Sequence, residues 1–208
     1  LKANKSYMYR FIENYPRIKS KTFIAHVRRE TGSSISHKNT HPFQRELNGI
    51  DFSFAHNGTL NYHTSLDTSN FKPVGDSDSE YAFCHILNKI KKENIHKWEE
   101  NSFKWLYNLI GEINQQGKFN CLLSNGKFLF CYYDIMKHKS LYYIHHDVIY
   151  SNKHLLDPDY KIRLELEEKK HEGYVIATEP LTDDKWEKFN PGELIVFKEG
   201  KIVFKANS

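Results

Sequence analysis

Asn57 and Gly58 are residues whose types and position could do chemistry. They follow the alternating stretch "FSFAH" and interrupt its pattern before Leu60. The alternation predicts a strand that stops at Asn57. Asn-Gly at the end of a strand is typical of an ordinary turn. The alternative is that Asn57 and Gly58 present a side-chain amide and a backbone N–H to a substrate.

Asp78 lies in a second candidate stretch, "GDSDSEYAF". Ser77 and Glu80 have the spacing of a capping box, in which Ser77 is the N-cap of a helix and Glu80 reaches back to it. In the simpler interpretation, Asp78 only stabilises the first turn of that helix through the helix dipole. In the other, its carboxylate faces a pocket and holds a substrate ammonium group.

Arg28 follows the apolar segment "KTFIAHV", residues 21–27, which predicts a buried strand. A guanidinium just beyond the end of a strand can bind a carboxylate through two parallel hydrogen bonds. A surface ion pair with a nearby acidic residue is the alternative interpretation.

The histidines and cysteines show no metal-binding or disulfide pattern. His41 precedes a proline, which favours an extended backbone at that histidine, and no regular element carries HxH or HxxxH spacing. Cys84, Cys121 and Cys131 are odd in number and lack CxxC spacing. We therefore expect no metal, no cofactor and no disulfide, and a reducing, cytoplasmic setting.

The remaining pattern predicts two helices among many strands. Each helix has one apolar stripe: Phe83, Ile86, Leu87 and Ile90 in the first, and Phe103, Leu106, Ile110 and Ile113 in the second. Strands are predicted at "IDFSFA", "LYYIHH", "GYVIAT" and in "ELIVFKEGKIVFK", and "FNCLLSNGKFLFCYY" is typical of a hairpin with a type I′ turn at Asn125-Gly126. This order favours antiparallel sheets flanked by helices.

Composition limits the class of protein. The chain has 208 residues, of which 27% are charged and 39% hydrophobic, as in one soluble domain. The net charge of +4 comes from scattered lysines, so we expect no nucleic-acid partner. No stretch has the length of a membrane span or the apolar core of a signal peptide, so we expect no membrane partner.

Four motifs together carry a resemblance that each alone does not. In order they are "AHVR", "NTHPF", "FAHNG" and "GDSDSEYAF", within residues 22–87. They closely resemble the class II glutamine amidotransferases of the N-terminal-nucleophile (Ntn) hydrolase superfamily, in particular its small stand-alone branch. The resemblance implies one domain over 1–208, with the α+β fold of that superfamily: a four-layer αββα sandwich of two mainly antiparallel sheets. It also implies that "SYMYRFIENYP" belongs to a helix.

The resemblance also implies roles for five residues. The Asn57 side-chain amide and the Gly58 N–H would form an oxyanion hole. Arg28 would bind the α-carboxylate of glutamine and Asp78 its α-ammonium. Thr31 matches a substrate-contacting threonine, although Glu30 stands where a small residue is usual.

The family's nucleophile is a cysteine at the mature N-terminus, whereas this sequence begins with Leu1. We expect the strands that carry this cysteine to be missing from the 208 residues, which alone would be inactive. Two hypotheses stay open: an enzyme that cleaves glutamine or another γ-glutamyl amide through a cysteinyl thioester, with an unknown protein accepting the ammonia, or a non-catalytic domain that binds a γ-glutamyl compound or a protein.

Overall fold

The computed structural model describes residues 20–26, 36–146, 153–155, 162–164 and 172–207. Its elements in chain order are η1 (His37–Asn39), β1 (Phe43–Leu47), β2 (Ile50–Leu60), η2 (His63–Ser65), α2 (Asp78–Lys92), α3 (Glu100–Asn114), β3 (Gly117–Ser124), β4 (Leu129–Tyr132), β5 (Tyr142–His146), β6 (Lys153–Leu155), β7 (Ile162–Leu164), β8 (Gly173–Ala177), β9 (Glu187–Lys188), β10 (Leu194–Lys198) and β11 (Lys201–Ala206).

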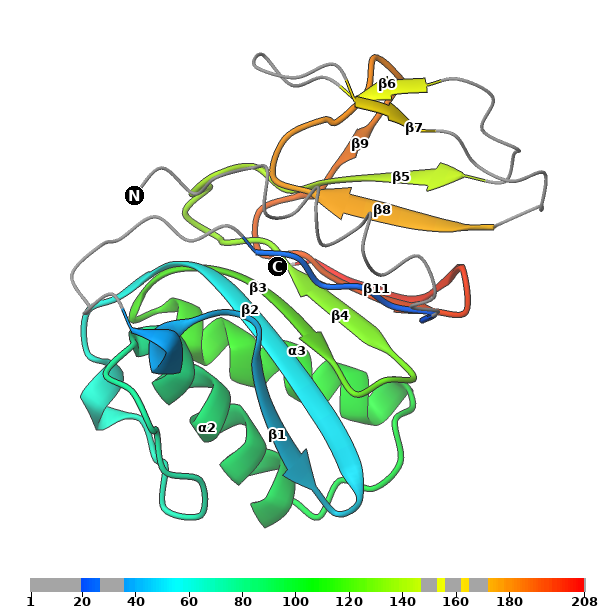
Figure 1. Cartoon of the computed structure of the whole chain (residues 1–208). Helices are drawn as coiled ribbons and strands as arrows, with labels where there is room; N and C mark the ends of the chain where they lie inside the picture. Colours follow the sequence, from blue (N-terminus) through cyan, green and yellow to red (C-terminus); the bar gives the residue numbers. More distant parts are fainter. Residues whose placement is uncertain (1–19, 27–35, 147–152, 156–161, 165–171, 208) are drawn as a thin grey trace.

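The main sheet has six antiparallel strands in the order β1-β2-β3-β4-β10-β11. Helices α2 and α3 lie side by side across one of its faces (Figure 1). The predicted apolar stripes of both helices are buried in the core between the helices and this sheet. Strand alternation supplies the other half of that core, because residues such as Phe52, Phe54 and Phe119 all point to the helical side.

A second, smaller sheet, β8-β5-β9, packs on the opposite face of the main sheet. Cys131, Ile195 and Phe197 of the main sheet meet Tyr143 of β5 and Tyr174 of β8 in a separate core. The layers are therefore helices, sheet and sheet, which confirms the two stacked antiparallel sheets and a helical layer. The helix predicted at residues 6–16 lies outside the described residues.

Two hairpin turns test the turn predictions. In "ELIVFKEGKIVFK" the sequence predicts two strands joined at Glu199-Gly200; both residues have positive φ, 47° and 75°, which confirms this tight connection between β10 and β11. At Asn125-Gly126 the type I′ prediction is wrong, because only Gly126 has a positive φ. Ser124 pairs with Leu129, so residues 125–128 form a four-residue loop, and the Asn125 side chain accepts bonds from the N–H groups of residues 127 and 128.

The strand predicted at residues 21–27 is not formed over residues 22–26, which have no regular secondary structure. A strand needs a partner for its N–H and C=O groups, and this segment joins no ladder within the described part of the chain. Phe23, predicted to be buried, is 68% exposed.

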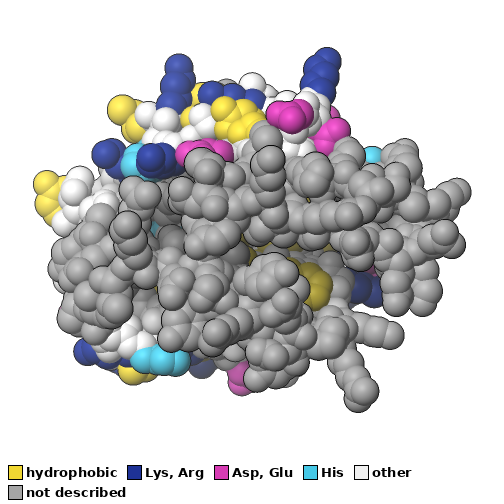
Figure 2. All heavy atoms as spheres, turned by 45° about the horizontal axis from the view of Figure 1, so that its top comes forward, with side chains coloured by type: hydrophobic (Ala, Val, Ile, Leu, Met, Phe, Trp, Pro, Cys, Tyr) yellow, Lys and Arg dark blue, Asp and Glu magenta, His cyan; other side chains and the backbone are white. Residues whose placement is uncertain are grey.

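The described surface carries mixed side chains. Where described side chains are visible in Figure 2, mainly near the rim of this face, lysine and arginine, acidic and hydrophobic side chains occur together. Within the described ranges, no helix is long and apolar enough to cross a membrane.

Candidate functional site

Strand β2 does not stop at Asn57. It continues to Leu60, and β3 pairs with it from Ser53 to Leu60: Asn57 lies opposite Asn120 and Gly58 opposite Phe119. The predicted strand end at Asn57 is therefore wrong, because the neighbouring strand continues the hydrogen-bonded ladder past the Asn-Gly pair. Asn57 and Gly58 are strand residues rather than turn residues.

The N–H of Gly58 points to the edge of β2 that faces away from β3. The N–H of its partner Phe119 donates to Asp134 Oδ1 (2.9 Å), so Gly58 and Phe119 form no pair of ladder bonds with each other. The backbone N–H of Gly58 therefore points in the same direction as that of Leu60, which leaves β2 on that edge. Strand β1 covers this edge only as far as the pair Phe43–Phe54.

The side chain of Asn57 lies on the face of the main sheet opposite the helices. Phe54 and His56 point to the helical side, and strand alternation directs Asn57 to the other one. Asn57 is half-buried, and Asn120 is its cross-strand neighbour on the same face.

Asp78 approaches β2 from the first turn of α2. Its Oδ2 accepts a bond from the N–H of Leu60 (2.8 Å), and its Oδ1 accepts one from the N–H of Ser79 (2.8 Å). The half-buried carboxylate thus lies at the same strand edge as Gly58, two residues further along. A carboxylate has about four acceptor positions, so capacity remains for a ligand.

The helix cap differs in part from the prediction. Ser77 is the N-cap, and its hydroxyl accepts from the Ser79 N–H, as expected. Glu80 does not close a capping box, because its buried carboxylate accepts bonds from the N–H groups of Val74 and Gly75 and pairs with Arg45. Glu80 therefore holds the loop before the helix against β1.

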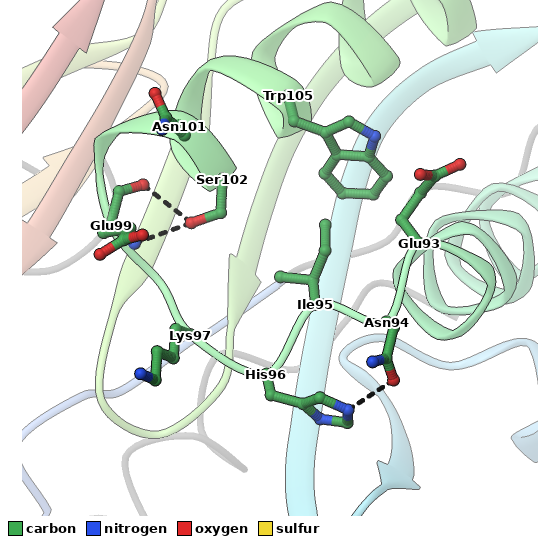
Figure 3. Close-up of a pocket in the computed structure, with 9 residues that line it drawn as sticks. All are labelled: Glu93, Asn94, Ile95, His96, Lys97, Glu99, Asn101, Ser102 and Trp105. Carbon is green, nitrogen blue, oxygen red and sulfur yellow. Dashed lines mark hydrogen bonds between the residues drawn. The ribbon is translucent and has the colours of Figure 1, made fainter.

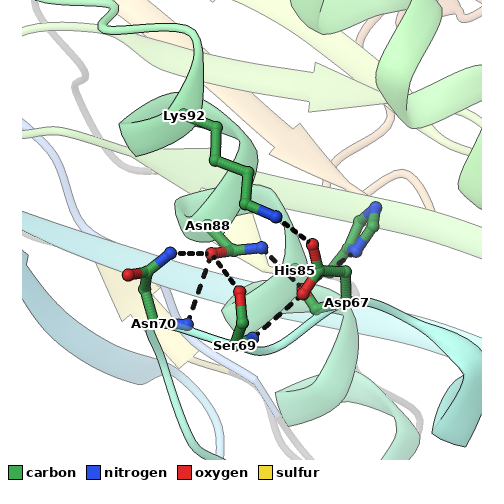
Figure 4. A network of polar contacts seen from close by, with 6 residues as sticks. All are labelled: Asp67, Ser69, Asn70, His85, Asn88 and Lys92. Carbon is green, nitrogen blue, oxygen red and sulfur yellow. Dashed lines mark hydrogen bonds and ion pairs between the residues drawn. The ribbon is translucent and has the colours of Figure 1, made fainter.

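That loop, residues 61–77, is fastened to α2 at two further places. Asn88 accepts bonds from Ser69 and Asn70 and donates to the carbonyl of Asp67, while Lys92 pairs with the Asp67 carboxylate (Figure 4). Closer to Asp78, Asn39 exchanges hydrogen bonds with Asp76. A Cβ at Gly75 would lie 2.1 Å from Asn39 Oδ1, so this approach requires glycine. The Asn39–Asp76 contacts therefore hold the loop at the start of α2, and Asn88 and Lys92 hold it to the last turns of the helix.

Two predicted site residues, Arg28 and Thr31, lie outside the described residues. His41 is joined to Pro42 by a cis peptide bond, and its ring stacks on that of His26 (centroids 4.3 Å apart). The structure thus brings Asn57, Gly58 and Asp78 to one end of β2.

None of the three cysteines suits a nucleophilic role. All are buried. Burial raises the pKa of the Cys84 thiol to about 11 and raises the pKa values of Cys121 and Cys131 further. The thiolate is the nucleophilic form, so these thiols are structural.

His56 is a site residue that the sequence analysis missed. It is buried between β2, β3 and the start of α2, where Nδ1 lies 2.9 Å from Ser79 Oγ and Nε2 lies 3.0 Å from the Lys118 carbonyl oxygen. Burial lowers its pKa, although Asp78 and the Lys118 carbonyl oppose that effect. The signal in the sequence was its position directly before Asn57.

A second buried network fixes the loop beside Asn57. The Asp134 carboxylate accepts bonds from the Asn114 side chain and from the N–H groups of Phe119 and His138. Asn120 accepts from the Asp134 N–H and donates to the carbonyls of residues 138 and 139. The loop after β4 is therefore held against the Asn57 side of the sheet.

A hollow of about 500 Å³ lies between the end of α2 and the start of α3, lined by residues that include His96, Glu99 and Trp105 (Figure 3). It adjoins the opposite end of α2 from Asp78, and the 15 residues of this helix span about 22 Å. It is therefore separate from the end of β2.

Comparisons with known proteins identify the family of this chain. The chain belongs to the family of class II glutamine amidotransferases, whose model matches residues 2–208. It is 40% identical over 191 residues to an uncharacterized protein of Methanocaldococcus jannaschii, with 91% of this chain and 54% of that protein covered. It is 37% identical over 198 residues to an Escherichia coli protein named "Putative glutamine amidotransferase YafJ", with 93% and 76% covered.

Solved structures give the same fold. A "predicted glutamine amidotransferase" from Pseudomonas aeruginosa is 32% identical with a TM-score of 0.70, over 81% of this chain and 66% of that one. A glutamine phosphoribosylpyrophosphate amidotransferase of B. subtilis is 17% identical with a TM-score of 0.55, over 88% of this chain and 34% of that one, which supports the fold alone. The chain spans about half the length of the Methanocaldococcus protein.

Proposed function

We propose that these 208 residues form a single domain of an enzyme that hydrolyses glutamine, or another γ-glutamyl amide, through a cysteinyl thioester. The observation that carries the proposal is that Gly58 and Asp78 meet at one edge of β2. The side chain of the adjacent Asn57 stands on the face of the sheet away from the helices. The ammonia either leaves the enzyme or passes to a partner protein.

Asn57 and Gly58 would stabilise the negative charge that develops on the amide oxygen. Both donors are neutral and belong to a strand paired on β3, so they need little reorganisation as the charge develops. Asp78 would hold the substrate's α-ammonium through its remaining acceptor capacity. Arg28 and Thr31 complete the proposal as carboxylate and substrate contacts.

The nucleophile in this proposal is the N-terminal cysteine that the family resemblance implies. Its sulfur attacks the amide carbon, the C–N bond breaks, ammonia leaves and a γ-glutamyl thioester remains. Water then cleaves the thioester, which gives glutamate and restores the thiol. The α-amine of that cysteine, with an ordinary pKa of about 7.7–8.0, would serve as the base.

The test is a glutaminase assay on the full-length protein with its N-terminal cysteine, together with variants of that cysteine, of Cys84 and of Asn57. We expect turnover in the wild type, its complete loss when the N-terminal cysteine is replaced by alanine, and retained turnover in Cys84→Ala. Turnover that depends on Cys84 would contradict the proposal. Glutamine binding without turnover in the wild type would favour the non-catalytic binding domain instead.

A further inference from the structure

His56 connects three elements at the candidate site. Its ring is 3% exposed and packs on Phe119 of β3, with the centroids 4.7 Å apart. One nitrogen contacts Ser79 in the first turn of α2 and the other contacts the Lys118 carbonyl on β3. A buried imidazole between two unlike partners has a defined proton arrangement.

The partners determine the tautomer. A carbonyl oxygen can only accept, so Nε2 carries the proton and donates to Lys118. In the neutral ring Nδ1 is then an acceptor, and the Ser79 hydroxyl donates to it over 2.9 Å. The same hydroxyl lies 3.3 Å from Asp78 Oδ1. Its single proton therefore serves either His56 or Asp78, and the shorter distance favours His56.

We infer that His56 is a positioning residue that joins the proposed oxyanion hole to the proposed ammonium site. This inference rests on the proposed function. The Lys118 bond holds the strand on which Asn57 and Gly58 lie, and the Ser79 bond directs the proton of the Ser79 hydroxyl away from the Asp78 carboxylate. With His56 neutral, Oδ1 of Asp78 stays available to the substrate ammonium.

Protonation of His56 would reverse this arrangement. Nδ1 would become a donor to Ser79, the Ser79 hydroxyl would turn to Asp78, and a positive charge would stand near the ammonium site. The charged groups that face His56 are Asp78 on α2, and Asp134 and His138 in and after the turn that follows β4. Since burial lowers the pKa of His56, the neutral form prevails at neutral pH.

Gly58 provides the space for this arrangement. A Cβ at position 58 would lie 1.9 Å from the Lys118 carbonyl oxygen and 2.6 Å from His56 Nε2. Any side chain there would break the bond between His56 and Lys118. The residue that supplies the proposed oxyanion N–H is thus also the one whose missing side chain admits the His56 bond.

The kinetic test compares two replacements of His56 and one of Ser79 in the full-length enzyme. His56→Phe loses both bonds, His56→Gln retains a donor for Lys118, and Ser79→Ala removes only the hydroxyl. We expect His56→Phe to lower kcat and raise KM, each about five- to tenfold, because neutral hydrogen bonds contribute on this scale. Ser79→Ala should change KM and leave kcat within about twofold. His56→Gln should recover most of kcat.

His85→Phe is the matched control. His85 is also buried and also contacts a backbone carbonyl, that of Asp67, but it lies on α2, about two turns beyond Asp78. It should lower the melting temperature and leave the kinetics unchanged. Equal kinetic effects of His85→Phe and His56→Phe would overturn the inference, because both would then act through stability alone.

The second readout does not need turnover. NMR of ring-labelled histidine should show His56 as the Nε2–H tautomer, and Asp78→Asn should lower the His56 pKa further because it removes the carboxylate that opposes the shift. Glutamine affinity of the wild type should fall as His56 protonates, and this dependence should vanish in His56→Gln. An unmoved His56 signal in Asp78→Asn would overturn the inference. A wild type that neither binds nor cleaves glutamine would instead refute the proposed function.

Discussion

Asn57 and Gly58 occupy adjacent positions of one strand, so their donors leave β2 in perpendicular directions. The Asn57 side chain stands on the face of the sheet, whereas the Gly58 N–H lies in the sheet's plane and points beyond its edge. An oxygen that accepts from both must lie above this edge, on the side away from the helices. Among the described strands, β1 pairs with this edge of β2 only from Phe54 back to Ile50, so it forms no ladder with Asn57 or Gly58.

At the residue scale, Asn57→Ala should depress kcat by roughly 10²–10³-fold, as removal of one oxyanion donor does elsewhere. KM should change much less, because the hydrogen bond strengthens only as the transition state forms. Steady-state kinetics on glutamine measure both. Asn101→Ala, an exposed position on α3, is the control. An effect confined to KM would show that Asn57 is only a ground-state contact.

Asp78→Asn should lower kcat/KM, with a loss of transition-state stabilisation of about 1.5–3 kcal/mol, because the amide lacks the charge that pairs with the substrate ammonium. The helix should stay capped by Ser77, whose bond to the Ser79 N–H is unaffected. Asp51→Asn, exposed on β2, is the control. A lower melting temperature with unchanged kinetics would show that Asp78 serves only the helix start.

At the element scale, the connection after β4 depends on one buried carboxylate. Asp134 is fully buried and accepts three hydrogen bonds, from a side chain of α3 and from backbone groups of β3 and its own loop. The loop carries two lysines, Lys137 and Lys139, with positive φ of 62° and 44°. Such backbone conformations persist only where surrounding contacts impose them.

Asp134→Asn should therefore destabilise the protein by about 1–3 kcal/mol, since an amide in place of the carboxylate turns a donor toward one of the three N–H donors. The urea midpoint should fall while the slope of the transition stays constant. Asp183→Asn, which is exposed, should leave the midpoint within experimental error. An unchanged midpoint for Asp134→Asn would contradict this prediction.

At the scale of the whole molecule, the main sheet has a core on each face, and the candidate site lies at the end of β2 beside both. The helical core holds β2 and α2 together, and the second core joins the main sheet to the smaller one. His56 and His85 are both buried in the described part of this structure. Burial lowers the pKa values of His56 and His85 below the ordinary 6.5.

A histidine with a lowered pKa binds its proton more readily in the unfolded chain. Stability is therefore full above about pH 6.5 and is lost as the pH falls from there toward the folded-state pKa. We expect the melting temperature to decrease between pH 7.5 and 5.5, and to decrease less in His85→Phe. Calorimetry or circular dichroism measures both slopes. A melting temperature that rises on acidification would contradict this prediction.

The sequence by itself determined the elements whose signals are local. The apolar stripes of α2 and α3 appear directly in the spacing of residues such as Phe83 and Phe103, because a helix repeats every 3.6 residues. Ser77 as an N-cap and Glu199-Gly200 as a tight turn are likewise fixed by neighbouring residues. The sequence also indicated the family, because the four motifs that carry the resemblance are short and follow a fixed order.

Only the tertiary structure decided where the candidate site's strand ends and what surrounds it. Strand β2 continues past Asn57 because β3, about sixty residues later, pairs with it, and no local pattern encodes that partner. The Glu80 carboxylate binds the N–H groups of residues 74 and 75 instead of closing a capping box. The hydrogen-bond partners of His56 are Ser79 and Lys118, neither of which is its neighbour in sequence. Such contacts depend on long-range packing, and therefore only the folded chain specifies them.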